Sequence, residues 1–255
     1  MKILVMVKQV PDTATRIRIN SDGTGIATDG IKWIINPYDE FALEEALRLR
    51  EKFGGEVVAV ALGPSRVEEA IRQSLAMGAD RAVHIKTEAE LDASLVAEAL
   101  GAVAREEGFD LILTGKQAVD DDAAQVGARL AVVLGVPQVT VVLKLEVDAE
   151  SRRVRAEREL EGASEMVEAP LPAVLTAQRG LNEPRYPTLP NIMKAKRKPV
   201  TVKTLEELGV GTVLQARVMA LTLPSERPAG RILEGEPEET VRELVRLLHE
   251  EAKVL

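Results

Sequence analysis

The sequence predicts an α/β protein with an open, doubly wound, mainly parallel sheet, and two observations carry this prediction. Unbroken apolar runs of strand length recur at residues 2–7, 56–62, 81–85 and 110–114. Such runs are typical of strands covered on both faces, as in a parallel sheet. Helical periodicity fills the intervals between the runs, and strands that alternate with right-handed helical crossovers build a doubly wound sheet.

The helices between these strands carry boundary signals. We expect them at residues 37–53, 65–77, about 92–107 and from about 121 to 134. Asn36 and Pro37 supply an N-cap and a proline at the first helical position, and Ser65 and Glu68 have the spacing of a capping box. A glycine follows each predicted helix, where it can adopt a left-handed conformation that ends the helix.

Two hairpins are predicted to extend the sheet. Residues 17–28 contain an Asp22-Gly23 turn, and residues 141–160 alternate in polarity on one side. A short turn between alternating segments is typical of a β-hairpin.

The pattern loosens from about residue 205. An arm is followed by a linker rich in Pro, Gly and Glu at 223–239 and by an amphipathic C-terminal helix. We therefore predict two parts, an α/β domain at 1–204 and an arm with its helix at 205–255.

Composition excludes several classes of function. The chain has 255 residues, no cysteine and two histidines, and its formal net charge is −8. Without cysteine there is no disulfide framework and no thiolate-ligated metal site, so we expect the protein to work in a reducing cytoplasm. An acidic chain disfavours general nucleic-acid binding, and the apolar runs are shorter than the roughly 20 residues of a membrane-spanning helix. His84 and His249 lie in different predicted elements, so we interpret both as structural.

A ligand of an open α/β sheet binds outside the carboxyl ends of the strands, where the winding reverses. This rule selects the residues from Lys8 onward, Asn36–Asp39, Gly63–Ser65 and the stretch "GKQAVDDDAAQ" at 115–125. In the last stretch a glycine follows a strand and lets the backbone approach a ligand, and the next helix offers unpaired N–H groups. These features predict a phosphate site.

Three consecutive carboxylates complicate the phosphate interpretation. Asp120, Asp121 and Asp122 would each repel a close phosphate by about 4 kcal/mol at an effective dielectric constant near 20. Either they cap the helix predicted from about residue 121, or one accepts hydrogen bonds from ribose hydroxyls or loop amides while N–H groups hold the phosphate. The loop is not a Walker A motif, because Gln117 replaces the Ser or Thr that would hold magnesium. No G-x-G-x-x-G fingerprint follows the first strand.

The stretch "RGLNEPRYPTLPNIMKAKRKP" at 179–199 has neither a strand period nor a long helix. Its prolines restrict the backbone and remove N–H donors, so we expect a preordered, exposed loop. Asn191 is a candidate N-cap for a short helix at 192–197, with Leu189 at the tip of the loop just ahead of it. Leu189 either folds back onto its own domain or reaches a partner. The basic "KAKRK" at 194–198 is either a solvated helix face or a docking surface.

The segment "LNEPRYPTLPNIMKAKRKP" within this stretch resembles the signature of the electron transfer flavoprotein β-subunit family. "GKQAVDDDAAQ" and "AMGADRAVHI" are similar to motifs of the same family, and the resemblance covers essentially the whole chain. It implies a Rossmann-like fold of the adenine nucleotide α-hydrolase-like type. It also implies an electron carrier without a substrate of its own, one half of an αβ heterodimer. The heterodimer takes electrons from acyl-CoA and related dehydrogenases on one FAD and passes them to a membrane quinone oxidoreductase.

The resemblance also implies specific site residues. FAD is held mainly by the α subunit, while the β subunit binds AMP in the crevice selected above. Matched position by position, the AMP contacts fall on Met6, Asn36, Pro37, Tyr38, Asp39, Leu62, Gly115, Lys116, Gln117, Ala118, Val119, Asp120, Asp121, Asp122, Ala123, Ala124, Gln125 and Val126. Tyr38 keeps the aromatic character of a family position near the flavin, whereas Thr13 stands where another member has a flavin-facing tyrosine. We expect no catalytic residue and no metal ligand.

Partner contacts implied by the resemblance lie in the 179–199 stretch. The leucine that matches Leu189 is the anchor that inserts into the dehydrogenase. The neighbouring positions expected to face the partner are Pro190, Ile192, Met193, Lys194, Lys196 and Arg197. The arm and helix at 205–255 are expected to pack on the α subunit.

Two other functions stay open. In the electron-bifurcating branch of the family a second FAD replaces AMP, and those members resemble "DGD" where this chain has "DDD" at 120–122. Asp121 would crowd and repel a flavin pyrophosphate, which favours AMP. A free-standing nucleotide sensor or adenylating enzyme of related fold would need a Gly/Ser-rich pyrophosphate loop after the first strand. The sequence "VKQVPDTATR" supplies none.

Overall fold

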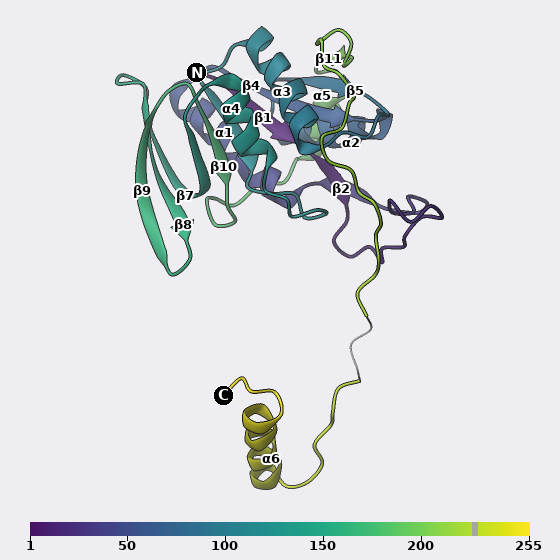
Figure 1. The fold of residues 1–255 in the computed structure, drawn as a ribbon. Helices are drawn as coiled ribbons and strands as arrows, with labels where there is room; N and C mark the ends of the chain where they lie inside the picture. The colour runs from purple at the N-terminus through teal and green to yellow at the C-terminus, as the bar shows by residue number, and fades with distance from the viewer. Residues whose placement is uncertain (226–228) are drawn as a thin grey trace.

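A sheet of nine strands organises the body of the protein (Figure 1). The computed structural model describes residues 1–225 and 229–255. The strands of this sheet are β1 (Lys2–Val7), β4 (Glu56–Gly63), β5 (Arg81–Lys86), β6 (Leu111–Gly115), β7 (Gln138–Asp148), β8 (Arg153–Leu160), β9 (Ala163–Pro170), β10 (Ala173–Ala177) and β11 (Val200–Lys203). They lie in the order β11-β5-β4-β1-β6-β10-β7-β8-β9, and neighbours from β11 to β7 are parallel. The predicted doubly wound, mainly parallel sheet is confirmed.

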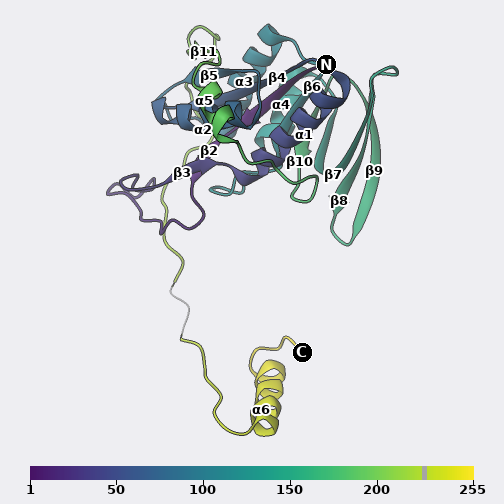
Figure 2. The ribbon, with the colours of Figure 1, turned by 180° about the vertical axis from the view of Figure 1, so that it is seen from behind.

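Helices cover both faces of this sheet (Figures 1 and 2). The helices of the described residues are α1 (Pro37–Phe53), α2 (Glu68–Met77) with a preceding 3₁₀ turn η1 (Ser65–Val67), α3 (Ala93–Glu107), α4 (Val126–Leu134), α5 (Leu189–Ala195) and α6 (Pro237–Glu250). Helices α1, α2 and α5 pack in the core on one face of the sheet, and α3 and α4 pack in the core on the other.

Strand β1 shows why the sheet is buried on both sides. Ile3 and Val5 point into the core beneath α1 and α2, while Leu4 and Met6 point into the core beneath α3 and α4. All four side chains are buried, and each contributes about 1.5–3 kcal/mol by leaving water. An unbroken apolar run therefore produces a central strand, because alternate residues meet different helical layers.

An antiparallel extension continues the parallel sheet beyond β7. Strands β7 and β8 form the hairpin predicted at 141–160, and β9 adds a third strand beside β8. The hairpin predicted at 17–28 is reduced to one bridge between Ile19 and Ile26 around a left-handed Gly23. This hairpin belongs to the loop that connects β2 (Gln9–Pro11) with β3 (Trp33–Ile35), and these two strands form a separate antiparallel sheet.

Two predicted helix starts are wrong. The capping box at Ser65 and Glu68 does not form, because residues 65–67 make a 3₁₀ turn and α2 begins at Glu68 without a side-chain cap. The helix predicted from about residue 121 begins at Val126, since the preceding acidic residues stay in a loop with tertiary partners. By contrast, α3 starts as predicted, with the Asp92 carboxylate accepting the N–H groups of Ser94 and Leu95.

The C-terminal arm ends in α6, which lies apart from the α/β body in both views (Figures 1 and 2). No residue of α6 is buried. Residues 226–228 of the predicted linker lie outside the described residues. Among the residues that are described, no helix combines the length and the apolar character needed to cross a bilayer.

An ion-pair cluster ties the end of α3 to the amino edge of the sheet. Glu107 binds the Lys2 ammonium at 2.8 Å and Nη1 of Arg81 at 2.9 Å, and Nε of Arg81 also binds Glu56 at 2.8 Å. The hydrogen bonds from Arg81 lower the pKa of Glu107 to about 2, against the opposing effect of burial and with help from Lys2. The ionised form of Glu107 therefore stabilises the fold.

We predict that Glu107→Gln destabilises the protein by about 1–2 kcal/mol near neutral pH, because the amide cannot satisfy both cations. The pKa of Glu107 is lower in the folded chain than in the unfolded chain. Its contribution is therefore complete above about pH 4.5 and is lost as pH falls toward about 2. Urea unfolding of both proteins from about pH 7 to pH 3, with Glu150→Gln as an exposed control, should show the difference shrinking in acid. A difference that stays constant with pH would contradict this assignment.

Candidate functional site

A cavity of about 230 Å³ lies at the carboxyl ends of β1, β4 and β6, where the strand order reverses. This is the position that the strand-end rule selects. The predicted residues that line it are Met6, Asn36, Asp39, Leu62, Gly115, Lys116, Gln117, Ala118, Asp121, Ala123, Ala124, Gln125 and Val126. The structure thus brings four separate predicted segments to one cavity: Met6, 36–39, Leu62 and 115–126.

Several residues of the cavity differ from the prediction. Five predicted positions do not line it: Pro37, Tyr38, Val119, Asp120 and Asp122. Eight lining residues were not among the predicted contacts: Val7, Lys8, Leu91, Ala93, Val96, Leu100, Thr114 and Gly127. Lys8 had a sequence signal, since it directly follows the first strand. Leu91 and the side chains from α3 had none, because the strand-end rule selects the loops after strands and not the helix that passes beside them.

The buried carboxylate of Asp39 joins three elements at the floor of the cavity. Its Oδ2 accepts the N–H of Lys8 at 2.7 Å, and its Oδ1 accepts the N–H of Gly115 at 2.9 Å and the Asn36 amide at 3.0 Å. Burial raises the pKa of Asp39 to about 7, although these donors favour the charged form. The ends of β1 and β6 are thereby fixed to the first turn of α1.

Gly115 allows this close approach. A Cβ at this position would collide with the Asp39 carboxylate and with both the side chain and the backbone of Tyr38. The backbone of α1 cannot yield to such a contact as a flexible side chain could. A glycine at the end of β6 is therefore a packing requirement of the site.

Asn36 holds the 115–125 loop instead of capping its own helix. Its position before α1 is that of an N-cap, but its side chain makes no cap hydrogen bond. The amide donates to the carbonyl of Gln117 at 2.9 Å and accepts the N–H of Val119 at 3.1 Å. Pro37 occupies the first helical position as predicted.

The three aspartates do not cap a helix, so that interpretation is wrong. The Lys8 ammonium binds Asp120 at 2.8 Å and Asp121 at 3.1 Å, and Asp122 accepts a hydrogen bond from the amide of Gln117. Burial alone would lower the pKa of Lys8, but the charges and hydrogen bonds of the two aspartates raise it above its usual value. Asp122 and Ala124 have φ of 49° and 51°, which is uncommon for residues other than glycine.

The cavity has two kinds of wall. Leu62, Leu91, Val96 and Leu100 form an apolar wall from β4 to α3, which suits a flat organic ring. The 115–125 loop and Lys8 form a polar wall that includes two lysines, Lys8 and Lys116, whose positive charge suits a phosphate. No cluster of three or more potential metal ligands occurs within residues 1–225 and 229–255.

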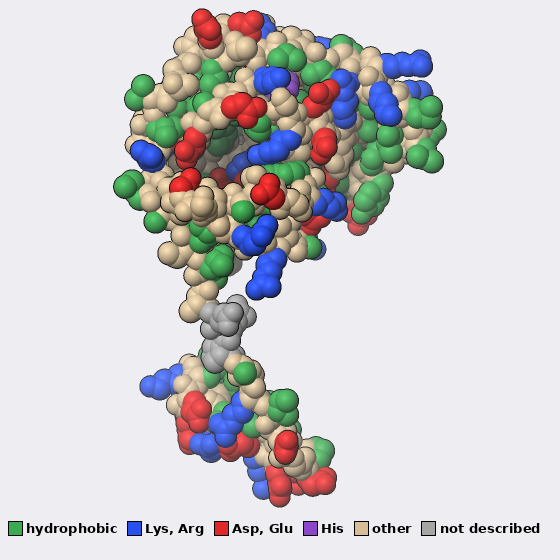
Figure 3. Space-filling view, turned by 90° about the vertical axis from the view of Figure 1, so that its right-hand side faces the viewer, with side chains coloured by type: hydrophobic (Ala, Val, Ile, Leu, Met, Phe, Trp, Pro, Cys, Tyr) green, Lys and Arg blue, Asp and Glu red, His purple; other side chains and the backbone are tan. Residues whose placement is uncertain are grey.

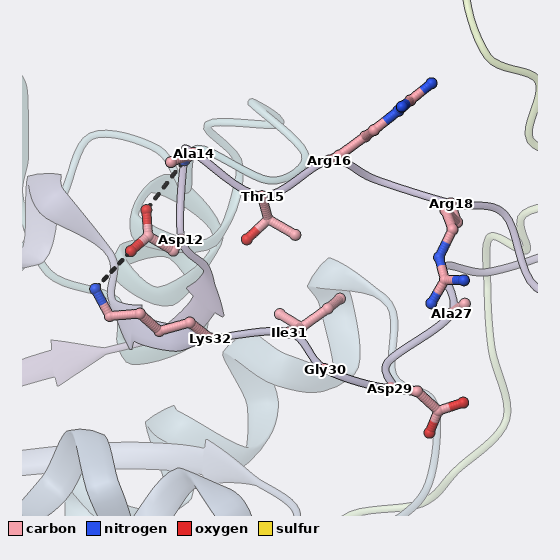
Figure 4. A pocket seen from close by; sticks show the side chains of 10 residues that line it. All are labelled: Asp12, Ala14, Thr15, Arg16, Arg18, Ala27, Asp29, Gly30, Ile31 and Lys32. Atoms are coloured by element: carbon pink, nitrogen blue, oxygen red, sulfur yellow. Dashed lines mark hydrogen bonds and ion pairs between the residues drawn. The ribbon is translucent and has the colours of Figure 1, made fainter.

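A second cavity of about 380 Å³ lies in the loop between β2 and β3 (Figure 4). Asp12 accepts hydrogen bonds from Lys32 and from the N–H of Ala14, and these lower the pKa of Asp12 in that order. Arg16 extends away from the cavity (Figure 4). The lining of this second cavity lacks the apolar wall found at the strand ends. Thr13 is exposed on the same loop.

Comparison with known proteins gives one consistent answer. The family profile described as "Electron transfer flavoprotein domain" matches residues 23–208. Electron transfer flavoprotein subunit beta of Bacillus subtilis (strain 168) is 42% identical over 261 residues, with 100% of each chain covered. The human protein of the same name is 44% identical over 259 residues, which cover 100% of this chain and 99% of the relative.

The chain belongs to the electron transfer flavoprotein β-subunit family. The family predicted from the motifs is thereby confirmed.

The 179–199 loop of this flavoprotein subunit is fastened to α1. Arg185 binds the buried carboxylate of Glu44 at 2.7 and 3.0 Å and also pairs with Glu51. The amide of Asn182 donates to the carbonyl of Phe41 and to Glu45, both at 3.0 Å. The loop is therefore anchored by charged and amide groups as well as by its prolines.

The end of this loop is the helix α5, whose cap differs from the prediction. Thr188, not Asn191, is the N-cap, and α5 begins at Leu189. The predicted partner-facing residues are all exposed: Pro190, Ile192, Met193, Lys194, Lys196 and Arg197. Leu189 itself is 78% exposed, so the alternative of a leucine folded back onto its own domain is wrong. Arg72 donates to the carbonyls of Ala195 and Lys198 and so ties the end of α5 to α2.

We predict that Gly115→Ala destabilises the protein by about 1–3 kcal/mol, because a methyl group would overpack the contact between β6 and α1 and displace Asp39. Gly211→Ala is the matched control, since a Cβ at Gly211 meets open space and its backbone is not left-handed. Thermal and urea unfolding measure the effect. Equal stability of the two variants would show that the Asp39 contact does not require glycine.

Proposed function

We propose that the chain is the β subunit of a heterodimeric electron transfer flavoprotein. In this proposal the heterodimer accepts electrons from acyl-CoA and related dehydrogenases in the cytoplasm and delivers them to a membrane quinone oxidoreductase. The subunit is an electron carrier and has no substrate of its own. The observation that carries the proposal is the full-length likeness to proteins named electron transfer flavoprotein subunit beta, at 42–45% identity.

AMP is the proposed ligand of the strand-end cavity. The apolar wall between β4 and α3 suits the adenine ring, and the polar wall suits one phosphate. Lys8 and Lys116 supply two positive charges, against the carboxylates of Asp120 and Asp121 beside them. A single phosphate group fits this near balance better than a pyrophosphate, which favours AMP over the second FAD of electron-bifurcating relatives.

One FAD per heterodimer is the proposed redox cofactor, held mainly by the α subunit. Tyr38 is the residue of this chain proposed to lie near the flavin. It sits in the first turn of α1, half-buried, with the Lys116 ammonium 5.4 Å from the centre of its ring. Thr13, although exposed, lacks the aromatic ring that would stack on a flavin.

The arm and α6 are proposed to pack on the α subunit. Large apolar side chains are exposed along the arm, among them Val213, Met219 and Ile232. Helix α6 likewise exposes Val241, Leu244 and Val245 on one face. Exposed apolar surface of this extent marks an interaction site.

On the face of the molecule in Figure 3 acidic and basic side chains are interspersed, without the continuous basic surface that nucleic acid requires.

Helix α5 and the loop before it are proposed to dock the dehydrogenases. Tyr186, Leu189 and Met193 place apolar groups in solvent on a segment fastened to α1 and α2. Because this segment is already ordered, docking loses little conformational entropy. Lys194, Lys196 and Arg197 would surround the apolar contact with positive charge.

We predict the cofactor content of the complex. Co-purified with its α subunit and extracted with acid, the heterodimer should release one FAD and one AMP, and the isolated β chain should carry no tightly bound flavin. Chromatography with absorbance detection measures both ratios. Two FAD and no AMP would replace this proposal with the electron-bifurcating one, and a complex without either nucleotide would refute it.

We predict that Leu189→Ala weakens dehydrogenase binding about ten- to hundredfold, as expected when a hot-spot side chain worth about 1.4–2.8 kcal/mol is lost. The flavin spectrum, AMP content and melting temperature should stay close to wild type. Val132→Ala on α4 is the matched control, because Val132 is 77% exposed, close to the 78% of Leu189. Reduction of the flavoprotein by a cognate dehydrogenase at subsaturating concentration measures the effect. Wild-type rates with Leu189→Ala would rule out the anchor role.

A further inference from the structure

We propose that Lys8 is a positioning residue of the nucleotide cavity, which acts by neutralising and holding Asp120 and Asp121 beside the bound phosphate. The inference rests on the proposed binding of AMP and deepens it. In this proposal Lys8 offsets the negative charge of the acidic loop, so that an anion can bind beside it.

The first support is the geometry around Lys8. Its backbone N–H is bound to Asp39 at 2.7 Å, which fixes the residue at the end of β1. Its ammonium crosses to the 115–125 loop and binds Asp120 at 2.8 Å and Asp121 at 3.1 Å. One nitrogen thus holds two consecutive carboxylates that lie 112 and 113 residues away in the sequence.

The second support is the charge balance of the polar wall. Asp121 lines the cavity together with Lys8 and Lys116. Without the Lys8 ammonium, the Asp121 carboxylate would line the cavity uncompensated, with that of Asp120 directly beside it. Like charges at such distances repel, and a bound anion would have to overcome that repulsion.

The third support is the shape of the loop. Residues Asp122 and Ala124 have left-handed backbone conformations, which persist only where surrounding contacts impose them. Among the described residues, Asp39 binds Gly115 and Asn36 binds Gln117 and Val119, whereas Lys8 is the side chain outside the loop that binds its aspartates. Lys8 therefore controls the side of the loop that carries the carboxylates.

The test compares two ligands that differ by one phosphate. AMP and adenosine are titrated by calorimetry into the nucleotide-free full-length chain, as wild type and as Lys8→Met. Lys32→Met is the matched control, because Lys32 also pairs with an aspartate, Asp12 at 2.8 Å, but on the loop away from this cavity. A third protein combines Lys8→Met with Asp120→Asn and Asp121→Asn.

We expect Lys8→Met to weaken AMP at least tenfold while adenosine binding changes less than twofold, and Lys32→Met to change neither. The combined variant should recover most of the lost AMP affinity, because neutral amides no longer repel the phosphate. Equal loss of AMP and adenosine would overturn the inference, since it would indicate a collapsed loop. Failure of the combined variant to recover would also overturn it, since Lys8 would then act on the phosphate directly. A wild-type chain that binds neither ligand would instead refute the proposed AMP site itself.

Discussion

The buried carboxylate of Asp39 is the contact on which the geometry of the site depends. Burying a charge is expensive, and here the cost is offset by hydrogen bonds from Lys8, Asn36 and Gly115, which belong to three separate segments of the chain. Desolvation still leaves the pKa of this carboxyl raised to about 7. Oδ1 accepts two of these hydrogen bonds and Oδ2 accepts the third, so loss of any one of them would leave the buried carboxylate less well compensated. The cavity is consequently bounded by strand ends that cannot move independently of α1.

Most of the fold could be predicted from the sequence, because strands covered on both faces must be apolar throughout. Strand β1 is an example, with alternate residues in two different cores. Strand β10 was not predicted. It lies between β6 and β7, although it follows the antiparallel extension in the chain, and only the long-range pairing of the sheet decides that place. Strand β11, at the edge beside β5, depends on long-range pairing in the same way.

The parts of the site at the strand ends could be predicted from the sequence. The parts whose conformation depends on side chains from distant segments could not. Asp120–Asp122 match the local pattern of a helix N-terminus, yet Lys8 and Gln117 bind their carboxylates and α4 starts only at Val126. The same competition explains Asn36, whose side chain binds the loop and not its own helix. In both cases a tertiary hydrogen bond replaced a local cap of similar strength. No local pattern indicates such partners.

Helix α1 connects the two regions to which function is proposed. Asp39 in its first turn fixes the cavity, and Glu44, five residues later, binds Arg185 of the 179–199 loop. Five residues correspond to about 7.5 Å along a helix axis, so the two anchoring carboxylates are held at a short and fixed spacing. The helix is buried against the sheet through Leu43 and Leu47 and therefore cannot shift without disturbing the core. Helix α1 thus sets the position of the 179–199 loop relative to the cavity, and the loop and the cavity need not contact each other.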